Sequence, residues 1–317
     1  MRKWLLAAVA ASSVCAARTT PAHAAGQTYR FAIVPKSLNN PYFDLARDGC
    51  MAEAKKLGNV QCIYTGPVNE DAAAEVQTIQ DLITRGVDGI AISVADAGSV
   101  ARVIQRARAA GIPVITFDAD APDSARQAYV GTDNRALGRS IAQELVKLHK
   151  TPGQYAMISG GPAAENLAER VSGVREVLKA AGWKEVAGSP TFCNDDSALG
   201  IQQMTDLMTG HPDLSAIVAV GGWPLFSQAA FGAFYQAHRP AIDGGKLTIV
   251  SADTLPAELA ELQAGQVGAL VGQQPAAMGA KAMDTLLALK QGKSVPKIEY
   301  VGLDVVTKDN VAAFMGH

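Results

Sequence analysis

Short apolar runs alternate with amphipathic segments along most of this chain. The run Arg30–Val34 is rich in β-forming residues and stops at Pro35, which predicts a strand. Over residues 43–57, apolar residues then recur every three or four positions, and Gly58 follows, which predicts a helix that ends there. Asn40, directly before a proline, is typical of a residue that caps the start of such a helix.

The same unit of strand and helix repeats to the end of the chain. We expect further strands at 60–65, 89–94, 112–117, 129–130, 155–159, 186–192, 216–220 and 247–250, and, after segments 256–263, 267–272 and 275–290, a late strand near 298–306. Strands that are almost continuously apolar and alternate with helices indicate parallel sheets covered on both faces. The number of strands is larger than one doubly wound sheet usually contains. We therefore predict two α/β lobes.

The division between these lobes follows from the second series of strands and helices, which begins near residue 133. We expect one lobe over 25–132 plus 274–302 and the other over 133–273 plus 303–317. No stretch rich in proline and serine separates them. The lobes are therefore expected to meet through hinge crossovers rather than through a flexible tether.

The first two dozen residues depart from the alternating pattern. Two basic residues precede an apolar stretch over 4–17, and a small-x-small cleavage site follows at 22–24. This layout predicts a secretory signal peptide over 1–24, and the apolar stretch is shorter than the about 20 residues of a spanning helix. The alternative is a lipoprotein site at Cys15. The bulky Val14 before it argues against that site, because a small residue is expected there. We expect export to the periplasm.

Composition and charge exclude several classes of protein. Of 317 residues, 48% are hydrophobic and 18% are charged, which suffices for two ordinary cores. The formal net charge is −2, and loss of the three basic residues of the signal peptide gives −2 − 3 = −5. Without a basic patch, no nucleic-acid partner is expected.

Three cysteines remain after the signal peptide, and they form no CxxC pair. Cys50 falls on a helical apolar face and Cys62 in a strand-like run, where a free cysteine behaves as a small hydrophobe. A disulfide between these two is possible in an oxidising compartment, although spacing alone does not establish it. We expect buried thiols.

Polar and aromatic residues stand directly after many of the predicted strands. In open parallel sheets, ligands bind just past the carboxyl ends of the strands. Planar carboxylate, amide and guanidinium groups hold vicinal hydroxyls, and aromatic faces cover the C–H face of a sugar ring. We therefore expect a small carbohydrate-like ligand in contact with Lys36, Asn40, Tyr42, Phe43, Ser93, Asp118, Asp120, Asn166, Arg170, Trp223, Asp253 and Gln273.

Four segments together resemble one known family. VPKSLNNPYFDLARDG, PVITFDAD after Gly111-Ile112, YVGTDN and ENLAERVSG are similar to segments of the sugar-binding proteins of bacterial ABC transporters, type I periplasmic class, which include ribose, rhamnose and autoinducer binders. The resemblance keeps its order over nearly the whole mature chain. It implies two doubly wound lobes joined by hinges, a monomer, an inner-membrane permease as partner, and neither cofactor nor metal.

The resemblance also assigns roles to the candidate residues. It places Asn40, Tyr42 and Phe43 at the ligand from the first strand–helix loop, and Asp118 at the ring hydroxyls. Arg170 corresponds to a guanidinium from the second lobe. The late polar contacts are Asp253 and Gln273, and Lys36 matches a lysine used by autoinducer and rhamnose-type members.

The chain departs from the ribose binders at three places. Ala119 stands where they carry arginine, Ser93 where they carry asparagine, and Gly221-Gly222 where they carry Asn-Asp. The residues expected to contact the sugar hydroxyls therefore differ from those of the ribose binders. A deoxysugar, polyol or furanose-like ligand fits better.

Each candidate also has a purely structural interpretation. Asn40 could only cap its helix, and Phe43 could belong to the core. Arg170 could lie on a helix surface, and Asp253 could cap the helix that begins at Pro256. Trp223 could pack in the core or on the surface of a lobe, and Lys36 could lie in a solvated turn.

Two other functions compete with a binding protein. A secreted carbohydrate-acting hydrolase could use Asp118 and Asp253 as an acid/base pair, but the motifs of common hydrolases and nucleotide enzymes are absent from the sequence. The four remaining histidines, at 149, 211, 238 and 317, show no metal-ligand spacing. A sugar-responsive regulator would need an N-terminal helix-turn-helix where the export signal stands. We expect no enzymatic activity.

Overall fold

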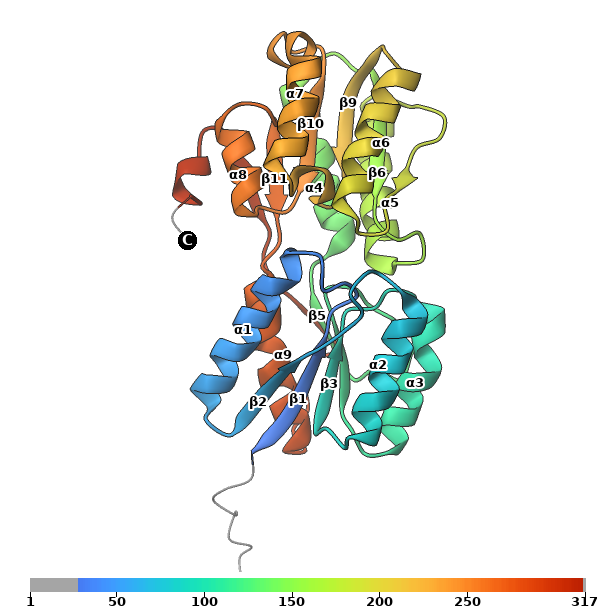
Figure 1. Cartoon of the computed structure of the whole chain (residues 1–317), viewed down its shortest axis with the longest axis vertical. Coiled ribbons are helices and arrows are strands. Elements are labelled where there is room, and N and C mark those ends of the chain that lie inside the picture. Colours follow the sequence, from blue (N-terminus) through green and yellow to red (C-terminus); the bar gives the residue numbers. More distant parts are fainter. Residues whose placement is uncertain (1–27, 316–317) are drawn as a thin grey trace, which may run out of the picture.

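The protein consists of two α/β lobes stacked along the long axis of the molecule (Figure 1). A computed structural model describes residues 28–315. The predicted signal peptide over 1–24 lies outside the described residues. The expected fold class of two mostly parallel α/β lobes is confirmed.

The first lobe, at the bottom of Figure 1, is built on a six-stranded parallel sheet. Its strands, in spatial order, are β12 (Ile298–Tyr300), β5 (Tyr129–Gly131), β4 (Val114–Phe117), β3 (Gly89–Ile92), β1 (Tyr29–Val34) and β2 (Val60–Tyr64). Helices α1 (Tyr42–Leu57) and α9 (Pro275–Lys290) cover one face, and α2 (Ala72–Thr84) and α3 (Ala97–Ala109) the other. Each face has its own core, because alternate residues of β1 point to opposite sides: Phe31 to one cluster and Ala32 to the other.

The second lobe has a seven-stranded sheet around one continuous core. Its strands are β13 (Asp304–Thr307), β11 (Ala269–Gly272), β10 (Thr248–Ala252), β9 (Leu214–Ala219), β6 (Gln154–Ser159) and β7 (Lys184–Glu185), with β8 (Thr191–Phe192) also paired to β6. Only β13 pairs antiparallel among the ladders of this sheet in the described residues. The helices are α4 (Asn134–Leu148), α5 (Glu165–Ala180), α6 (Ser197–Gly210), α7 (Gln228–Asp243), α8 (Pro256–Gln263), and two short 3-10 turns, η1 (Trp223–Leu225) and η2 (Val311–Ala313).

Two of the expected strands are each divided in the structure. The one expected over 186–192 is replaced by β7 and β8, because Gly188 has a positive φ of 82° and Pro190 cannot donate to a ladder. The late strand expected near 298–306 becomes β12 and β13, which belong to different sheets. The chain passes between the two sheets at 131–134, 272–275 and 300–304.

The cysteines correct one prediction. Cys50 on α1 and Cys62 on β2 form a disulfide, with Cα atoms 6.0 Å apart, rather than the two buried thiols that we expected. The helix packs on its neighbouring strand, which brings into reach two residues that are 12 positions apart in the sequence. Cys193 is buried and free. Within residues 28–315, no helix has the length and apolar character needed to cross a bilayer.

Glycines set the close approach of α1 and α9. A Cβ added to Gly49 would lie 1.9 Å from the backbone oxygen of Ala276, and one added to Gly279 would lie 1.9 Å from that of Ala46. The two helix backbones therefore touch directly. This contact matters for the site because α9 begins two residues after the chain leaves the second lobe.

Candidate ligand-binding site

A small cavity lies between the two lobes, where the carboxyl ends of several strands meet. Its free volume is about 20 Å³, and it is lined by Lys36, Asn40, Tyr42, Phe43, Asp118, Asn166, Leu167, Arg170, Asp195, Trp223, Asp253 and Gln273. Ten of the twelve residues proposed from the sequence line it. Because that volume suits about one water molecule, a larger ligand requires these side chains to turn or the lobes to part.

Two aspartates that line this cavity share the same left-handed backbone conformation. Asp118 follows β4 with φ 59°, and Asp253 follows β10 with φ 72°. The left-handed region costs a non-glycine residue free energy and is tolerated best by aspartate and asparagine. Each strand thus ends on a kink that aims a carboxylate into the cavity.

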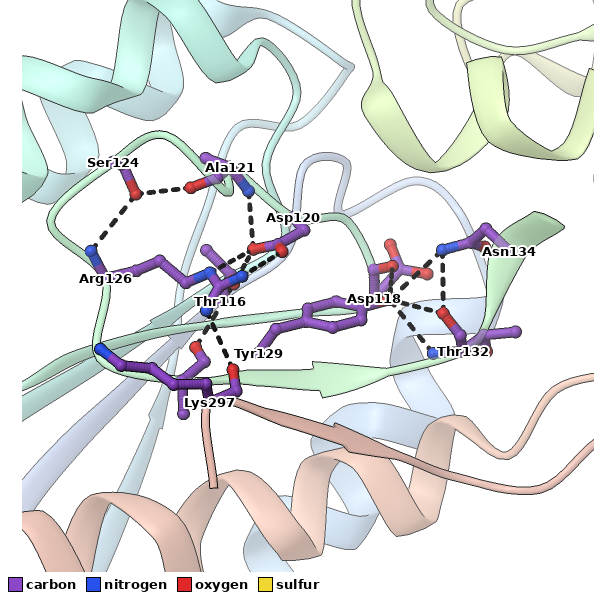
Figure 2. A network of polar contacts seen from close by, with 11 residues as sticks. Thr116, Asp118, Asp120, Ala121, Ser124, Arg126, Tyr129, Thr132, Asn134 and Lys297 are labelled. Atoms are coloured by element: carbon purple, nitrogen blue, oxygen red, sulfur yellow. Dashed lines mark hydrogen bonds and ion pairs between the residues drawn. The ribbon is translucent and has the colours of Figure 1, made fainter. Parts of the chain in front are cut away.

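The Asp118 carboxylate is held from behind by the first lobe. Ser93 Oγ, at the end of β3, donates to Asp118 Oδ2 at 2.6 Å. Tyr129 Oη donates to the backbone oxygen of Asp118 at 2.9 Å and accepts from the backbone N–H of Thr132 at 3.1 Å (Figure 2). Ser93 therefore orients the carboxylate and does not itself line the cavity.

Arg170 is at the centre of the network in the second lobe. Its Nε donates to Asn134 Oδ1 at 2.8 Å, its Nη1 to the backbone oxygen of Val220 at 3.0 Å, and its Nη2 to Gln273 Oε1 at 2.8 Å. The residue is 2% exposed, so the alternative of a surface position on the helix is wrong. Three acceptor oxygens, one for each guanidinium nitrogen, hold the plane of the guanidinium in one orientation.

Asp253 completes that network. Its Oδ1 accepts from Gln273 Nε2 at 2.8 Å and its Oδ2 from the backbone N–H of Gly222 at 3.0 Å. Burial raises the pKa of Asp253, against the opposing effects of Arg170 and Gln273. The backbone N–H of Leu255 instead bonds to Glu258 at the start of α8, so Asp253 is not the cap of that helix.

Lys36 and Asn40 reach across the cleft to Asp195. Asn40 Nδ2 donates to Asp195 Oδ2 at 3.0 Å, while Asn40 Oδ1 accepts from the backbone N–H of Tyr42 at 3.0 Å. Asn40 thus supports the start of α1 and links the lobes. Lys36 Nζ lies 3.8 Å from Asp195 Oδ1, and its side chain is 3% exposed rather than solvated. Burial lowers the pKa of Lys36, but Asp195, Glu70 and Asp118 outweigh it and leave a net rise.

Aromatic side chains form the apolar part of the wall. Phe43 lines the cavity and also packs edge-on against Tyr42 and Phe117, with ring centroids 5.2 and 6.2 Å apart. It therefore belongs to both core and cavity. Trp223, in the turn after β9, is 3% exposed and also lines the cavity.

Asp120 lies elsewhere, which corrects the residue set expected from the sequence. Its carboxylate accepts from Arg126 Nε at 2.6 Å and from Thr116 Oγ1 at 2.5 Å (Figure 2). Asp120, Arg126 and Tyr300 line a separate pocket near the crossovers. The reason is backbone direction: Asp118 has a positive φ, so the chain turns away from the cavity before it reaches Asp120.

Asp195 lines the cavity from the loop after β8 and is 6% exposed, although it was not among the residues expected from the sequence. The signal was present, because the polar run Asn194-Asp195-Asp196 follows an apolar segment as the other candidates do. Asn194 and Asp195 both have positive φ, 48° and 57°.

Several buried polar atoms at this cavity have no hydrogen-bond partner within the described residues. They are Lys36 Nζ, Asn166 Oδ1, Asp195 Oδ1 and Trp223 Nε1. An unsatisfied buried donor or acceptor costs roughly 1–3 kcal/mol. The set contains two donors and two acceptors, which is the complement of a ligand whose groups both donate and accept.

Glu70 lies between the lobes and lines a second pocket, which it shares with Asp195. A Cβ added to Gly161 of the second lobe would lie 2.4 Å from Glu70 Oε1, so only a glycine leaves room for this carboxyl. Burial raises the pKa of Glu70 to about 7, although Lys36 opposes the rise.

Comparison with known proteins places this geometry among binding proteins. Residues 31–294 match the family model described as periplasmic binding protein domain. The ribose import binding protein RbsB of Escherichia coli K12 is 29% identical over 300 residues, 94% of this chain and 96% of that protein. The D-allose-binding periplasmic protein of the same organism is 29% identical over 88% of this chain and 89% of its own length.

Solved structures agree in fold. An ABC transporter solute-binding protein from Burkholderia graminis, in complex with D-arabinose, has a TM-score of 0.82 and 34% identity, covering 90% of this chain and 98% of that one. The glucose-galactose binding protein GanP from Geobacillus stearothermophilus has a TM-score of 0.81 and 29% identity, covering 90% and 99%.

Proposed function

The chain belongs to the periplasmic binding protein domain family, and from this premise we propose that its interlobe cavity captures a small neutral sugar, deoxysugar or polyol. The protein is the substrate-binding component of an ABC-type carbohydrate importer. Relatives that bind ribose, allose and arabinose support the ligand class.

One observation carries the proposal: charged and amide side chains from both lobes converge on one cavity beside aromatic rings. Lys36, Asn40 and Asp118 come from the first lobe, and Arg170 and Asp253 from the second. A ligand that bonds to both sets gains its full binding energy only when the lobes are closed. Binding thereby drives hinge closure.

We further propose the course of transport. The chain is exported by its predicted signal peptide and acts in the periplasm as a monomer. Its lobes, 25–132 with 274–302 and 133–273 with 303–317, turn about the three crossovers. The closed form presents a surface that an inner-membrane permease distinguishes from the open form. No chemistry on the sugar is needed, so we expect no turnover and no cofactor.

Thermal shift and isothermal titration calorimetry test the binding. The panel is D-ribose, D-arabinose, D-allose, D-galactose, D-fucose and ribitol. A sugar that binds the folded state raises the melting temperature by mass action. Asp118→Ala should abolish the shift and leave the protein folded, since the side chain belongs to the cavity rather than the core. Asp123→Ala, an exposed aspartate five positions on, is the matched control.

Two results would contradict the proposal. One is normal sugar binding by folded Asp118→Ala. The other is release of a chemically altered sugar after incubation with the protein, which would favour a hydrolase that uses Asp118 and Asp253.

A further inference from the structure

Lys36 Nζ and Asp195 Oδ1 face each other across the cavity without a hydrogen bond. The two atoms are 3.8 Å apart, and the side chains are 3% and 1% exposed. A charge-assisted hydrogen bond between ammonium and carboxylate spans about 2.7–2.9 Å. Neither atom has another hydrogen-bond partner within residues 28–315. A buried ion pair left open in this way forgoes the contact that would offset its desolvation.

The position of Asp195 is determined independently of Lys36. Its Oδ2 accepts from Asn40 Nδ2 at 3.0 Å, which holds the carboxylate from the first lobe. Oδ1 is the oxygen of this carboxylate that is left without a hydrogen bond. Lys36 lies in the loop after β1 and Asp195 in the loop after β8, so the gap between them lies between the lobes.

We propose that Lys36 and Asp195 form a hydroxyl-reading pair, in which one ligand hydroxyl accepts from Lys36 Nζ and donates to Asp195 Oδ1. A hydroxyl is a donor and an acceptor at once. Its oxygen fits at about 2.8 Å from each atom, because two hydrogen bonds of that length together exceed the gap. The inference rests on the proposed function and adds a named position of specificity to it.

The hydroxyl-reading pair restricts which chemical group of the ligand can lie between Lys36 and Asp195. A carboxylate or phosphate oxygen cannot donate to Asp195, and an ammonium group cannot accept from Lys36. A C–H group at this position does neither and leaves both charges buried. The ligand therefore carries a neutral hydroxyl here, and a deoxysugar binds only if the missing hydroxyl lies elsewhere on the ring.

A sugar analogue that lacks this hydroxyl should bind much more weakly than the parent sugar. Sites built to hydrogen-bond a hydroxyl discriminate sharply against the analogue without it, because their buried polar groups are left unpaired. Since Lys36 and Asp195 come from opposite lobes, the penalty arises only on closure. The analogue should then fail to close the lobes as well as bind weakly.

The test is a cycle of ligand and protein changes by isothermal titration calorimetry. Wild type, Lys36→Met and Asp195→Asn are titrated with each panel sugar that wild type binds and with its monodeoxy analogues. We expect one analogue to bind wild type at least about 100-fold more weakly than the parent sugar. In either variant this ratio should collapse to within about fivefold, while the ratios for the other analogues stay unchanged.

Matched controls separate this effect from a general loss of charge or stability. Lys184→Met and Asp213→Asn make the same substitutions at exposed positions of the second lobe and should keep the wild-type ratios. The sugar-free melting temperature shows whether each variant folds. If Asp195→Asn does not fold, Lys36→Met alone measures the same coupling.

The outcomes distinguish the inference from the proposed function. If every monodeoxy analogue shows the same ratio in wild type and variants while Asp118→Ala loses binding, the hydroxyl-reading pair is overturned and the proposed function stands. If wild type binds no sugar of the panel, the proposed function fails, and the inference with it.

Discussion

Arg170 Nη2 donates to Gln273 Oε1 at 2.8 Å, directly beside the second passage of the chain between the lobes. The same amide oxygen accepts from Thr132 Oγ1 at 2.9 Å, at the first passage. Gln273 Nε2 bonds to Asp253. One amide thus connects the ligand cavity to two of the three crossovers, which couples ligand contacts to the hinge.

Gln273→Leu should therefore weaken both the fold and the site. The change leaves Arg170 Nη2 and Asp253 Oδ1 without their partner, which costs about 1–3 kcal/mol in free energy of unfolding. Sugar affinity should fall at least about tenfold. Urea unfolding and calorimetry measure the two effects, with Gln202→Leu on the exposed side of α6 as control. Equal stability of Gln273→Leu and wild type would contradict the network.

The disulfide between Cys50 and Cys62 should contribute measurably to stability. The bond closes a loop between residues 12 positions apart, for which chain entropy predicts about 3 kcal/mol. The double variant Cys50→Ser/Cys62→Ser should melt at a lower temperature than wild type. Dithiothreitol should lower the melting temperature of wild type but not that of the double variant. A response of both proteins to the reductant would argue against the assignment.

Gly279→Ala should destabilise the first lobe. Its Cβ would collide with the backbone oxygen of Ala46 on α1, and overpacking of this kind costs about 1–3 kcal/mol. Gly232→Ala on α7 is the matched control, because no heavy atom stands near the added carbon. Alanine should stabilise that helix by about 0.5–1 kcal/mol. Chemical unfolding of both variants should therefore shift in opposite directions.

Glu75 should make the stability depend on pH. Burial raises the pKa of Glu75 to about 8, so the folded state binds this proton more tightly than the unfolded state does. The stabilisation is complete below the ordinary pKa near 4.5 and is lost as the pH rises through 8. Glu75→Gln keeps the neutral form at every pH. Its stability should match wild type at pH 5 and exceed it at pH 9; equal values at pH 9 would contradict the burial of a neutral carboxyl.

Glu70 should couple sugar binding to a proton. In the closed form its pKa is raised to about 7, chiefly by burial, and opening of the lobes returns the carboxyl to water and its pKa toward 4.5. Closure therefore takes up a proton, and sugar affinity should fall as the pH rises from 6 to 8. Titrations in buffers of different ionisation enthalpy measure this uptake. Glu70→Gln should remove it, and an unchanged pH profile in that variant would exclude Glu70 as the source.

Much of the fold could be predicted because its signals are local. The apolar runs became β1, β3, β4 and β9 with small shifts of their ends, since a strand buried on both faces must be apolar throughout. The division of 186–192 was missed because Gly188 and Pro190 interrupt a run whose composition otherwise suits a strand. The disulfide was not expected, for another reason: the spacing of the cysteines does not tell which helix face lies against which strand.

The rule that ligands lie past strand ends placed Asp118, Asp253, Lys36 and Gln273 correctly at one cavity, and the family and its transport role were confirmed. The rule depends only on which residue follows each apolar run. By itself, the sequence therefore determined the strand-and-helix order, the two lobes and most of the polar side chains at the cleft.

Only the tertiary structure decided which of these side chains meet. A positive φ at Asp118 turned Asp120 away toward Arg126, and the loop after β8 brought Asp195 within 3.8 Å of Lys36 from the opposite lobe. Both outcomes depend on a backbone angle or on the packing of two lobes. The approach of Asp195 joins residues more than 100 positions apart, and the turn at Asp118 depends on one backbone angle. The pattern of apolar and polar residues along the chain encodes neither.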